Sequence, residues 1–200
     1  MIWEDIGFLL KKRNFSENSI IAQFFTKDHG KTSGIIYGGT SRKVKNYLQV
    51  GNKLKLIYKS KNVEKIGYFS TEIADVNSAI YFDNKKILLC IQSTCYFLLT
   101  LLPENEKNPV IYKNSEELFK NFKNKDWILH YINWERMLIK ELGFEANIKN
   151  EIFDQNKKMS KSSIFSALDY NKKLLFSYFF TPNKIDFSFE RRCLENYYKN

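Results

Sequence analysis

Residues 20–39 read IIAQFFTKDHGKTSGIIYGG, and they contain the clearest strand pattern of the chain. Every second residue of Ile20–Phe24 points to one face of a β-strand. In the segment Lys27–Lys31, which follows, Asp, His and Gly can adopt positive φ and close a hairpin. Gly34 and Gly38 then flank Ile35–Tyr37 and permit the bends by which a short sheet closes on itself. The segment therefore predicts a hairpin in a curved sheet.

The same alternation occurs on both sides of this hairpin. We expect three residues of each flanking strand to face inward: Ile6, Phe8 and Leu10 before the hairpin, and Leu54, Leu56 and Tyr58 after it. About five short strands in about seventy residues are typical of an OB-type barrel. The predicted fold class is α+β, with an N-terminal OB-type β-barrel in residues 1–75 and a mainly α-helical domain in residues 76–200.

After residue 75 the apolar period lengthens from two residues to that of a helix. Ile80–Leu102 is predicted to be an apolar helix that Pro103 ends. Either Asn114 or Ser115 can cap a short second helix that runs to Phe122. These features predict a helical second domain.

The strongest helical pattern lies between Asp126, a candidate N-cap, and Gly143, a candidate terminator. Glu135 falls on its mostly apolar face, where a carboxylate needs a partner. The candidate partners are Arg136, Lys140 or a backbone amide. A structural role is favoured over catalysis for Glu135.

Positive charge is concentrated in the predicted barrel. Residues 1–70 hold 13 Lys and Arg against 5 Asp and Glu, whereas residues 71–200 hold 19 against 17. A basic barrel surface can neutralise phosphates and gain affinity from counterion release. The 27 lysines and 20 asparagines of the chain also fit the composition of an AT-rich genome, so charge alone leaves nucleic-acid binding open.

Several protein classes are not expected. No basic leader precedes an apolar stretch, so secretion is not predicted. The most apolar run, Ile87–Leu102, is too short and too polar for a membrane span. Cys90, Cys95 and Cys193 form no pairable framework, which fits a reducing cytoplasm. We expect a cytoplasmic protein, associated with the nucleoid if it binds DNA, that makes no contact with a membrane.

Several motifs, taken in order, resemble those of one family. Arg13–Ile21, Phe24–Lys31, Gly38–Arg42 and Leu48–Gly51 are similar to the amino-terminal domain of RecO, a bacterial recombination mediator of DNA repair. Asn133–Phe144 resembles a second landmark, an aromatic-Glu-x-x-Leu-Leu-x-x-Leu-Gly-aromatic segment of the family's helical domain. The chain is identified as a short, zinc-less member of the RecO family.

The resemblance implies a non-enzymatic DNA-binding protein without a cofactor. Such a protein would bind single- and double-stranded DNA, promote strand annealing and, with RecR, load RecA onto DNA coated by single-strand DNA-binding protein. The basic residues that we expect to contact DNA are Lys11, Lys12, Arg13, Lys27, Lys31, Arg42, Lys43 and Lys45. The residues that we expect to receive the acidic tail of single-strand DNA-binding protein are Leu138, Lys140, Leu142, Lys172 and Lys173.

The chain departs from the family in one respect. Many RecO proteins carry four zinc-binding cysteines after the Leu-Gly-aromatic landmark, and residues 145–192 contain none. We therefore predict that the chain holds no metal and that its zinc lobe, around residues 145–165, is absent or degenerate. Residues 145–161 are expected to form a polar loop.

Three further features of the sequence each have an alternative interpretation. Gly38–Lys43 lacks the ending of a nucleotide-binding loop and is interpreted as a barrel loop that touches a nucleic-acid backbone. Cys90 or Cys95 with His130 could form a nucleophile and base, but thiols in an apolar helix are usually packing groups. His29 is interpreted as a turn residue with positive φ.

Two other functions remain compatible with the sequence. A generic OB-fold module that binds RNA or DNA explains the barrel and its charge, but not the helical landmark. A scaffold that binds only proteins predicts that the basic barrel surface tolerates charge reversal.

Overall fold

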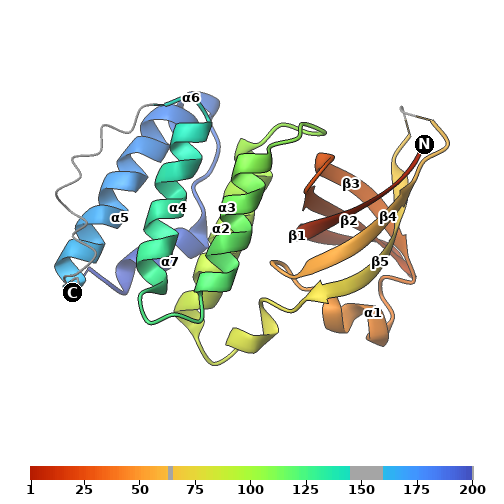
Figure 1. The fold of residues 1–200 in the computed structure, drawn as a ribbon, viewed down its shortest axis with the longest axis horizontal. Helices are drawn as coiled ribbons and strands as arrows, with labels where there is room; N and C mark the ends of the chain where they lie inside the picture. The colour runs from red at the N-terminus through yellow and green to blue at the C-terminus, as the bar shows by residue number, and fades with distance from the viewer. Residues whose placement is uncertain (63–64, 145–159, 200) are drawn as a thin grey trace. The chain divides into compact units, whose positions relative to one another are not determined.

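A computed structural model describes residues 1–62, 65–144 and 160–199 of the chain. These residues form two compact units, Met1–Tyr112 and Lys113–Asn200. The first unit contains a closed five-stranded barrel, and the described residues after the barrel are mainly helical (Figure 1). The predicted α+β class, with an OB-type barrel before the helices, is confirmed.

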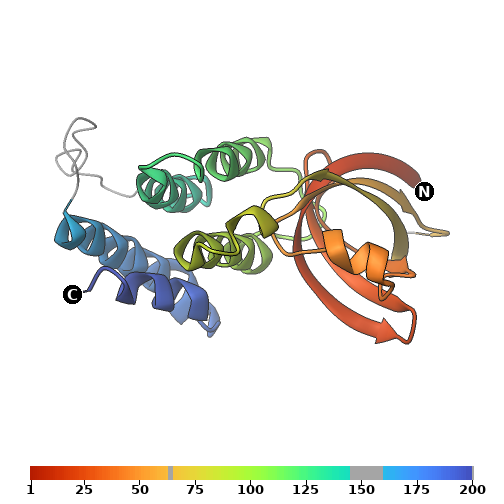
Figure 2. The ribbon, with the colours of Figure 1, turned by 90° about the horizontal axis from the view of Figure 1, so that it is seen from below.

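The barrel is built from β1 (Ile2–Ser16), β2 (Ser19–Thr26), β3 (Gly30–Tyr37), β4 (Lys53–Lys59) and β5 (Gly67–Asp75). The strands are hydrogen-bonded in the closed order β1-β2-β3-β5-β4. All the strand pairs are antiparallel except β3 with β5. The long strands curve around a common interior, as the ribbon in Figure 2 shows. The sheet therefore has no free edge, which is the property that barrel closure provides.

The interior of the barrel agrees with the expected alternation in β2 and β4 but not in β1. Leu9, and not Phe8 or Leu10, belongs to the core inside the barrel. Phe8 packs instead against the ring of Tyr112, with centroids 5.6 Å apart. The residues that fill the interior are Leu9, Ile20, Ala22, Phe24, Ile36, Leu48, Leu54, Leu56, Tyr58 and Phe69. Residues 7–10 are all buried, so both faces of β1 are covered here. The alternation of apolar residues therefore could not show which face of β1 points into the barrel.

The predicted hairpin joins β2 to β3. Thr26 pairs with Gly30, whose φ of +66° needs a residue without a Cβ penalty. A Cβ at this position would also lie 2.1 Å from the carbonyl oxygen of Glu106. Gly30 is therefore required both by its backbone conformation and by the close approach of a second segment.

The apolar helix α2 (Lys85–Leu101) begins later than predicted. Residues Ala79–Tyr81 form a separate 3₁₀ turn, and the side chain of Asn84 then caps α2 by accepting a hydrogen bond from the amide of Ile87. The predicted start at Ile80 was wrong because the apolar pattern continues across the cap residue Asn84 and does not reveal it. Cys95 is buried in α2, and this burial raises the pKa of its thiol to about 12, which fits the packing role expected for it.

The helix expected to start at Asn114 or Ser115 starts earlier. Helix α3 (Pro109–Asn121) begins with proline in its first turn, and the Asn108 side chain accepts a hydrogen bond from the amide of Ile111. Ser115 lies buried inside the helix and accepts a hydrogen bond from Trp134 at 3.1 Å. The Ser115 hydroxyl therefore pairs with a buried residue of α4 and does not cap a helix.

The remaining helices are α4 (Trp127–Glu141), α5 (Lys161–Leu175), α6 (Thr181–Asn183) and α7 (Phe189–Asn196), with a π-helical turn at Phe176–Phe180. Helix α4 matches the prediction, since Asp126 occupies the N-cap position and Gly143 has a φ of +91°. Helix α5 already begins at Lys161, which corrects the end of the predicted loop. The rest of that loop, residues 145–159, lies outside the described residues.

Glu135 is fully buried on α4, as predicted, but its partners come from other helices. Arg191 of α7 donates hydrogen bonds to both carboxylate oxygens, at 2.5 and 3.2 Å. Asn171 of α5 adds a third at 3.0 Å. The prediction that Glu135 would bond Arg136, Lys140 or a backbone amide is therefore wrong. Arg136 instead donates to the side chain of Asn171 at 3.1 Å. The network joins α4, α5 and α7 of the second unit, and the ribbons of these three helices are labelled in Figure 1.

Within the described part of the chain, no helix combines the length and the apolar character that crossing a membrane requires.

Candidate nucleic-acid interface

The glycine-rich segment after β3 leads into a short helix, α1 (Arg42–Tyr47), and not into an extended loop as predicted. Gly38 has a φ of +68°, and its carbonyl accepts a hydrogen bond from the amide of Ser41, so the chain turns here before the helix begins. The hydroxyl of Tyr47 donates to the carbonyl oxygen of Thr71 on β5 at 3.1 Å. This contact attaches α1 to the barrel.

Helix α1 presents the three predicted cations of this segment, Arg42, Lys43 and Lys45, to solvent. Lys12 of β1 joins them, because its ammonium donates to the carbonyl oxygen of Leu48 at the end of α1. Burial, together with the positive charge of nearby Lys45, lowers the pKa of Lys12. We call these four cations the α1 patch.

Lys11 and Arg13 are also exposed, but they lie on the opposite face of β1 from Lys12. An irregularity in the β1–β2 register between Leu9 and Lys11 changes which side chains face inward. Beyond it, Lys12 lies opposite the interior residue Ala22. Lys11 and Arg13 therefore point outward beside the α1 patch and do not extend it directly.

The two cations predicted at the β2–β3 hairpin do not join the α1 patch. Lys27 is exposed, but its amide pairs with the carbonyl of Ile6, which places it about 16 Å along β1 from Lys11. The side chain of Lys31 is 9% exposed, and its ammonium donates to the carbonyl of Leu99 at 2.7 Å. Lys31 is therefore corrected from a surface cation to a buried structural one.

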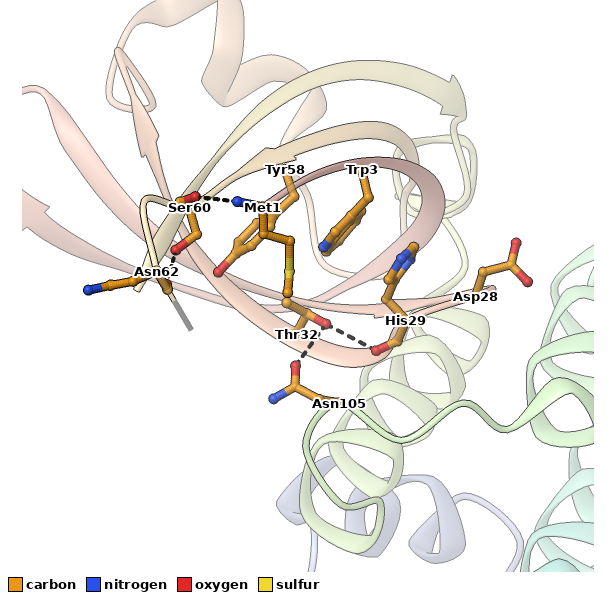
Figure 3. A pocket seen from close by; sticks show the side chains of 9 residues that line it. All are labelled: Met1, Trp3, Asp28, His29, Thr32, Tyr58, Ser60, Asn62 and Asn105. Atoms are coloured by element: carbon orange, nitrogen blue, oxygen red, sulfur yellow. Dashed lines mark hydrogen bonds between the residues drawn. The ribbon is translucent and has the colours of Figure 1, made fainter. Parts of the chain in front are cut away.

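An aromatic pocket, which the sequence did not indicate, opens near the hairpin (Figure 3). Its volume is about 330 Å³, and its walls include Trp3, His29, Tyr58, Thr32 and Asn105. The Trp3 ring is stacked between His29, with centroids 4.0 Å apart, and Tyr58, with centroids 4.7 Å apart. An isolated Trp3 in a strand carries no pattern that predicts this three-ring stack.

His29 has a role other than the one predicted. It is not among the positive-φ residues of the described chain, because Gly30 supplies that conformation. The Nδ1 atom of His29 lies 2.8 Å from a carboxylate oxygen of Asp5, whose side chain is 1% exposed. The same oxygen accepts hydrogen bonds from the amides of Asp28 and His29, at 2.9 and 3.1 Å. His29 therefore anchors the hairpin and forms a wall of the pocket.

The predicted partner-binding residues of the helical unit are in different environments. Lys140 is exposed and Leu142 is half-buried, but Leu138 is fully buried and cannot form the floor of an open pocket. Lys172 bonds Glu195 at 2.5 Å and Asp169 at 3.1 Å, and Lys173 bonds Asp169 at 2.8 Å. Lys172 is therefore held between two carboxylates, whereas the side chain of Lys173 is 72% exposed, so Lys140 and Lys173 are the accessible cations of the predicted set.

Metal-binding residues do not gather in the part of the chain that the structure describes. Within residues 1–62, 65–144 and 160–199, no group of three or more His, Cys, Asp and Glu side chains is arranged to hold an ion. Most of the region expected to contain the degenerate zinc lobe, residues 145–159, lies outside these ranges.

Two family models match the chain: Recombination protein O N terminal over residues 1–76, and Recombination protein O C terminal over residues 86–166. A DNA repair protein RecO of Ruegeria sp. (strain TM1040) is 31% identical over 149 residues, which cover 74% of this chain and 62% of the relative. A protein of the same name from Cereibacter sphaeroides (strain ATCC 17029 / ATH 2.4.9) is 34% identical over 148 residues, with the same coverage. The chain thus spans about 62% of the length of these curated relatives.

Proposed function

Since this chain belongs to the RecO family, we propose that it acts as a recombination mediator in bacterial DNA repair. It binds single- and double-stranded DNA and promotes the annealing of complementary strands. With RecR, it loads RecA onto DNA coated by single-strand DNA-binding protein. This role is non-enzymatic, needs no cofactor and belongs to the cytoplasm, at the nucleoid.

The observation that carries the proposal is the α1 patch. Arg42, Lys43 and Lys45 lie exposed on one short helix, and Lys12 lies beside its end. Such a cluster can contact consecutive phosphates without reading bases, as a protein that handles DNA of any sequence requires. Lys11 and Arg13, on the outer face of the adjacent strand, are placed to contact a longer DNA segment.

We further propose that the helical unit receives the acidic, aromatic-ended tail of single-strand DNA-binding protein. Lys140 is the cation best suited to meet the carboxylates of the tail, because it is exposed at the end of α4, whereas Lys172 and Lys173 are paired with Glu195 and Asp169. Leu142, half-buried nearby in sequence, can supply apolar contact.

The DNA-binding proposal is tested by equilibrium binding to a single strand and a duplex of equal length at several salt concentrations. Replacing Arg42 and Lys43 by Ala should weaken binding to both. It should also reduce the slope of log affinity against log salt by about 0.7 to 0.9 per lost phosphate contact. An unchanged slope would show that Arg42 and Lys43 of the α1 patch make no contact with DNA phosphates.

The matched control replaces Lys123 and Lys125 by Ala, which removes two exposed cations from the loop before α4. The net charge of this variant equals that of the test variant. It should bind DNA like the original chain if location, and not total charge, determines affinity. Equal weakening by both variants would indicate a non-specific effect of charge.

A further inference from the structure

We propose that the aromatic pocket of the barrel binds one nucleobase of single-stranded DNA. This inference rests on the proposed DNA binding and adds to it a base-contacting site separate from the α1 patch. The pocket is lined by Trp3, His29 and Tyr58 on one side and by Thr32 and Asn105 on another (Figure 3). Its volume of about 330 Å³ lies within the range typical of small-ligand sites.

The aromatic wall is rigidly held. Trp3 lies within 7° of parallel to His29 and within 21° of parallel to Tyr58. Tyr58 in turn packs against Phe69 in the barrel core, with centroids 5.0 Å apart, and its hydroxyl accepts a hydrogen bond from the amide of Gly67. Because His29 and Tyr58 cover the two faces of Trp3, a base would pack against the ring edges of this stack, and a preformed aromatic surface loses little entropy in such a contact.

The opposite wall supplies hydrogen-bonding groups in fixed positions. The amide of Asn105 donates to the carbonyl of Lys31 at 2.8 Å, which attaches this loop to the barrel. The side-chain oxygen of Asn105 lies 3.4 Å from the hydroxyl of Thr32, so that its amide nitrogen can donate to another acceptor. Bases carry carbonyl and ring-nitrogen acceptors on their edges, which match such a donor.

The charges around the pocket also favour a nucleic-acid ligand. The carboxylate of Asp28 at the rim is paired with Lys107 at 2.6 Å, and that of Asp5 is bound by His29 and backbone amides. Lys61 and Lys65 are exposed in the segment after Ser60, which lines the pocket. The hydroxyl of Ser60 donates to the carbonyl of Lys65 at 3.1 Å, which places the backbone of Lys65 beside a residue that lines the pocket. A base inside the pocket would have its phosphates near these two lysines.

The test compares two oligonucleotides of equal length and charge, oligothymidine and the same backbone without bases. The full chain should bind the strand with bases more tightly, on the order of tenfold for one base packed against the aromatic rings. The salt slopes of the two strands should agree, because their phosphate contacts are the same.

The variant Asn105→Asp removes the donor while retaining a side chain that tolerates the φ of 56° at this position. The ratio of the two affinities should then fall toward one. The matched control, Asn18→Asp, makes the same charge change at an exposed turn between β1 and β2 and should preserve the ratio. Using the ratio cancels the general effect of an added negative charge.

A second measurement uses Trp3 itself as a reporter. The strand with bases should quench tryptophan fluorescence, and the baseless strand should not. The variant Trp3→Phe, which keeps an aromatic ring in the stack, should lose this quenching while it still binds DNA. Strong binding with equal affinity for the two strands would overturn the base pocket alone. Failure of both strands to bind would overturn the proposed function together with it.

Discussion

Replacing Arg191 by Met should destabilise the helical unit more than most single substitutions can. Arg191 and Glu135 are both fully buried, and the guanidinium bonds both oxygens of the carboxylate. Burial disfavours the charged form, but the adjacent Glu135 offsets this and raises the pKa of Arg191 above its ordinary value. The variant would leave Glu135 buried, with the Asn171 amide as the remaining side-chain donor of the described network.

Leaving one member of a buried ion pair without its partner costs about 3–5 kcal/mol. Arg191 also donates to the carbonyl of Leu168 at 2.8 Å, and this hydrogen bond would be lost as well. For a unit of this size, such a loss lowers the melting temperature by more than about 10 °C. The assay is thermal and urea unfolding followed by circular dichroism at the helical band.

Two comparisons make this prediction specific. Replacing Glu135 and Arg191 together by Met should be less damaging than the single change, because no buried charge is left unpaired. Arg192→Met removes an exposed neighbour and should change the stability by less than about 1 kcal/mol. A stabilising role for the buried pair would be excluded if Arg191→Met were as stable as Arg192→Met, or if the double variant were less stable than Arg191→Met.

Two further predictions concern the barrel unit and the cysteines. Gly30→Ala should destabilise the protein far more than Gly38→Ala in urea unfolding, because a Cβ at Gly30 meets a carbonyl at 2.1 Å whereas one at Gly38 meets nothing within 4 Å. Both changes carry the cost of about 1–2 kcal/mol for a left-handed residue, so equal losses would contradict the proposed role of Glu106. With a thiol reagent at pH 8, half-buried Cys193 should react first. Buried Cys95, whose pKa is about 12, should react only when the protein unfolds. Early labelling of Cys95 would contradict its inert packing role.

Much of the fold could be predicted because local patterns reflect it directly. Alternation identified β2 and β4, and Gly143 marked the end of α4. Alternation did not identify the inward face of β1, because the strand is covered on both sides and its register shifts after Leu9. The start of α3 could have been recognised from Asn108 followed by Pro109, a cap and a first-turn proline.

The site was less predictable because its geometry depends on contacts distant in sequence. Lys31 resembled any other lysine at a turn, and its structural role is shown by contacts distant in sequence: the bond to the carbonyl of Leu99, 68 residues away, and the ion pair with Glu104. The partner of Glu135 lies 56 residues away on α7. The stack of Trp3 on His29 likewise forms only when β1 closes against the β2–β3 hairpin. The sequence could therefore identify the charged residues, but not which of them are exposed and able to bind a ligand.

Binding of DNA to the barrel at the α1 patch can be mapped residue by residue in solution. Backbone amide resonances would be recorded while a single-stranded oligonucleotide is added to the full chain. If DNA binds at the α1 patch, the largest shifts should occur in α1, at Arg42–Tyr47, and in the adjacent part of β1, at Lys11–Arg13. Large shifts confined to α4 and α5, with the resonances of α1 and β1 unchanged, would contradict it.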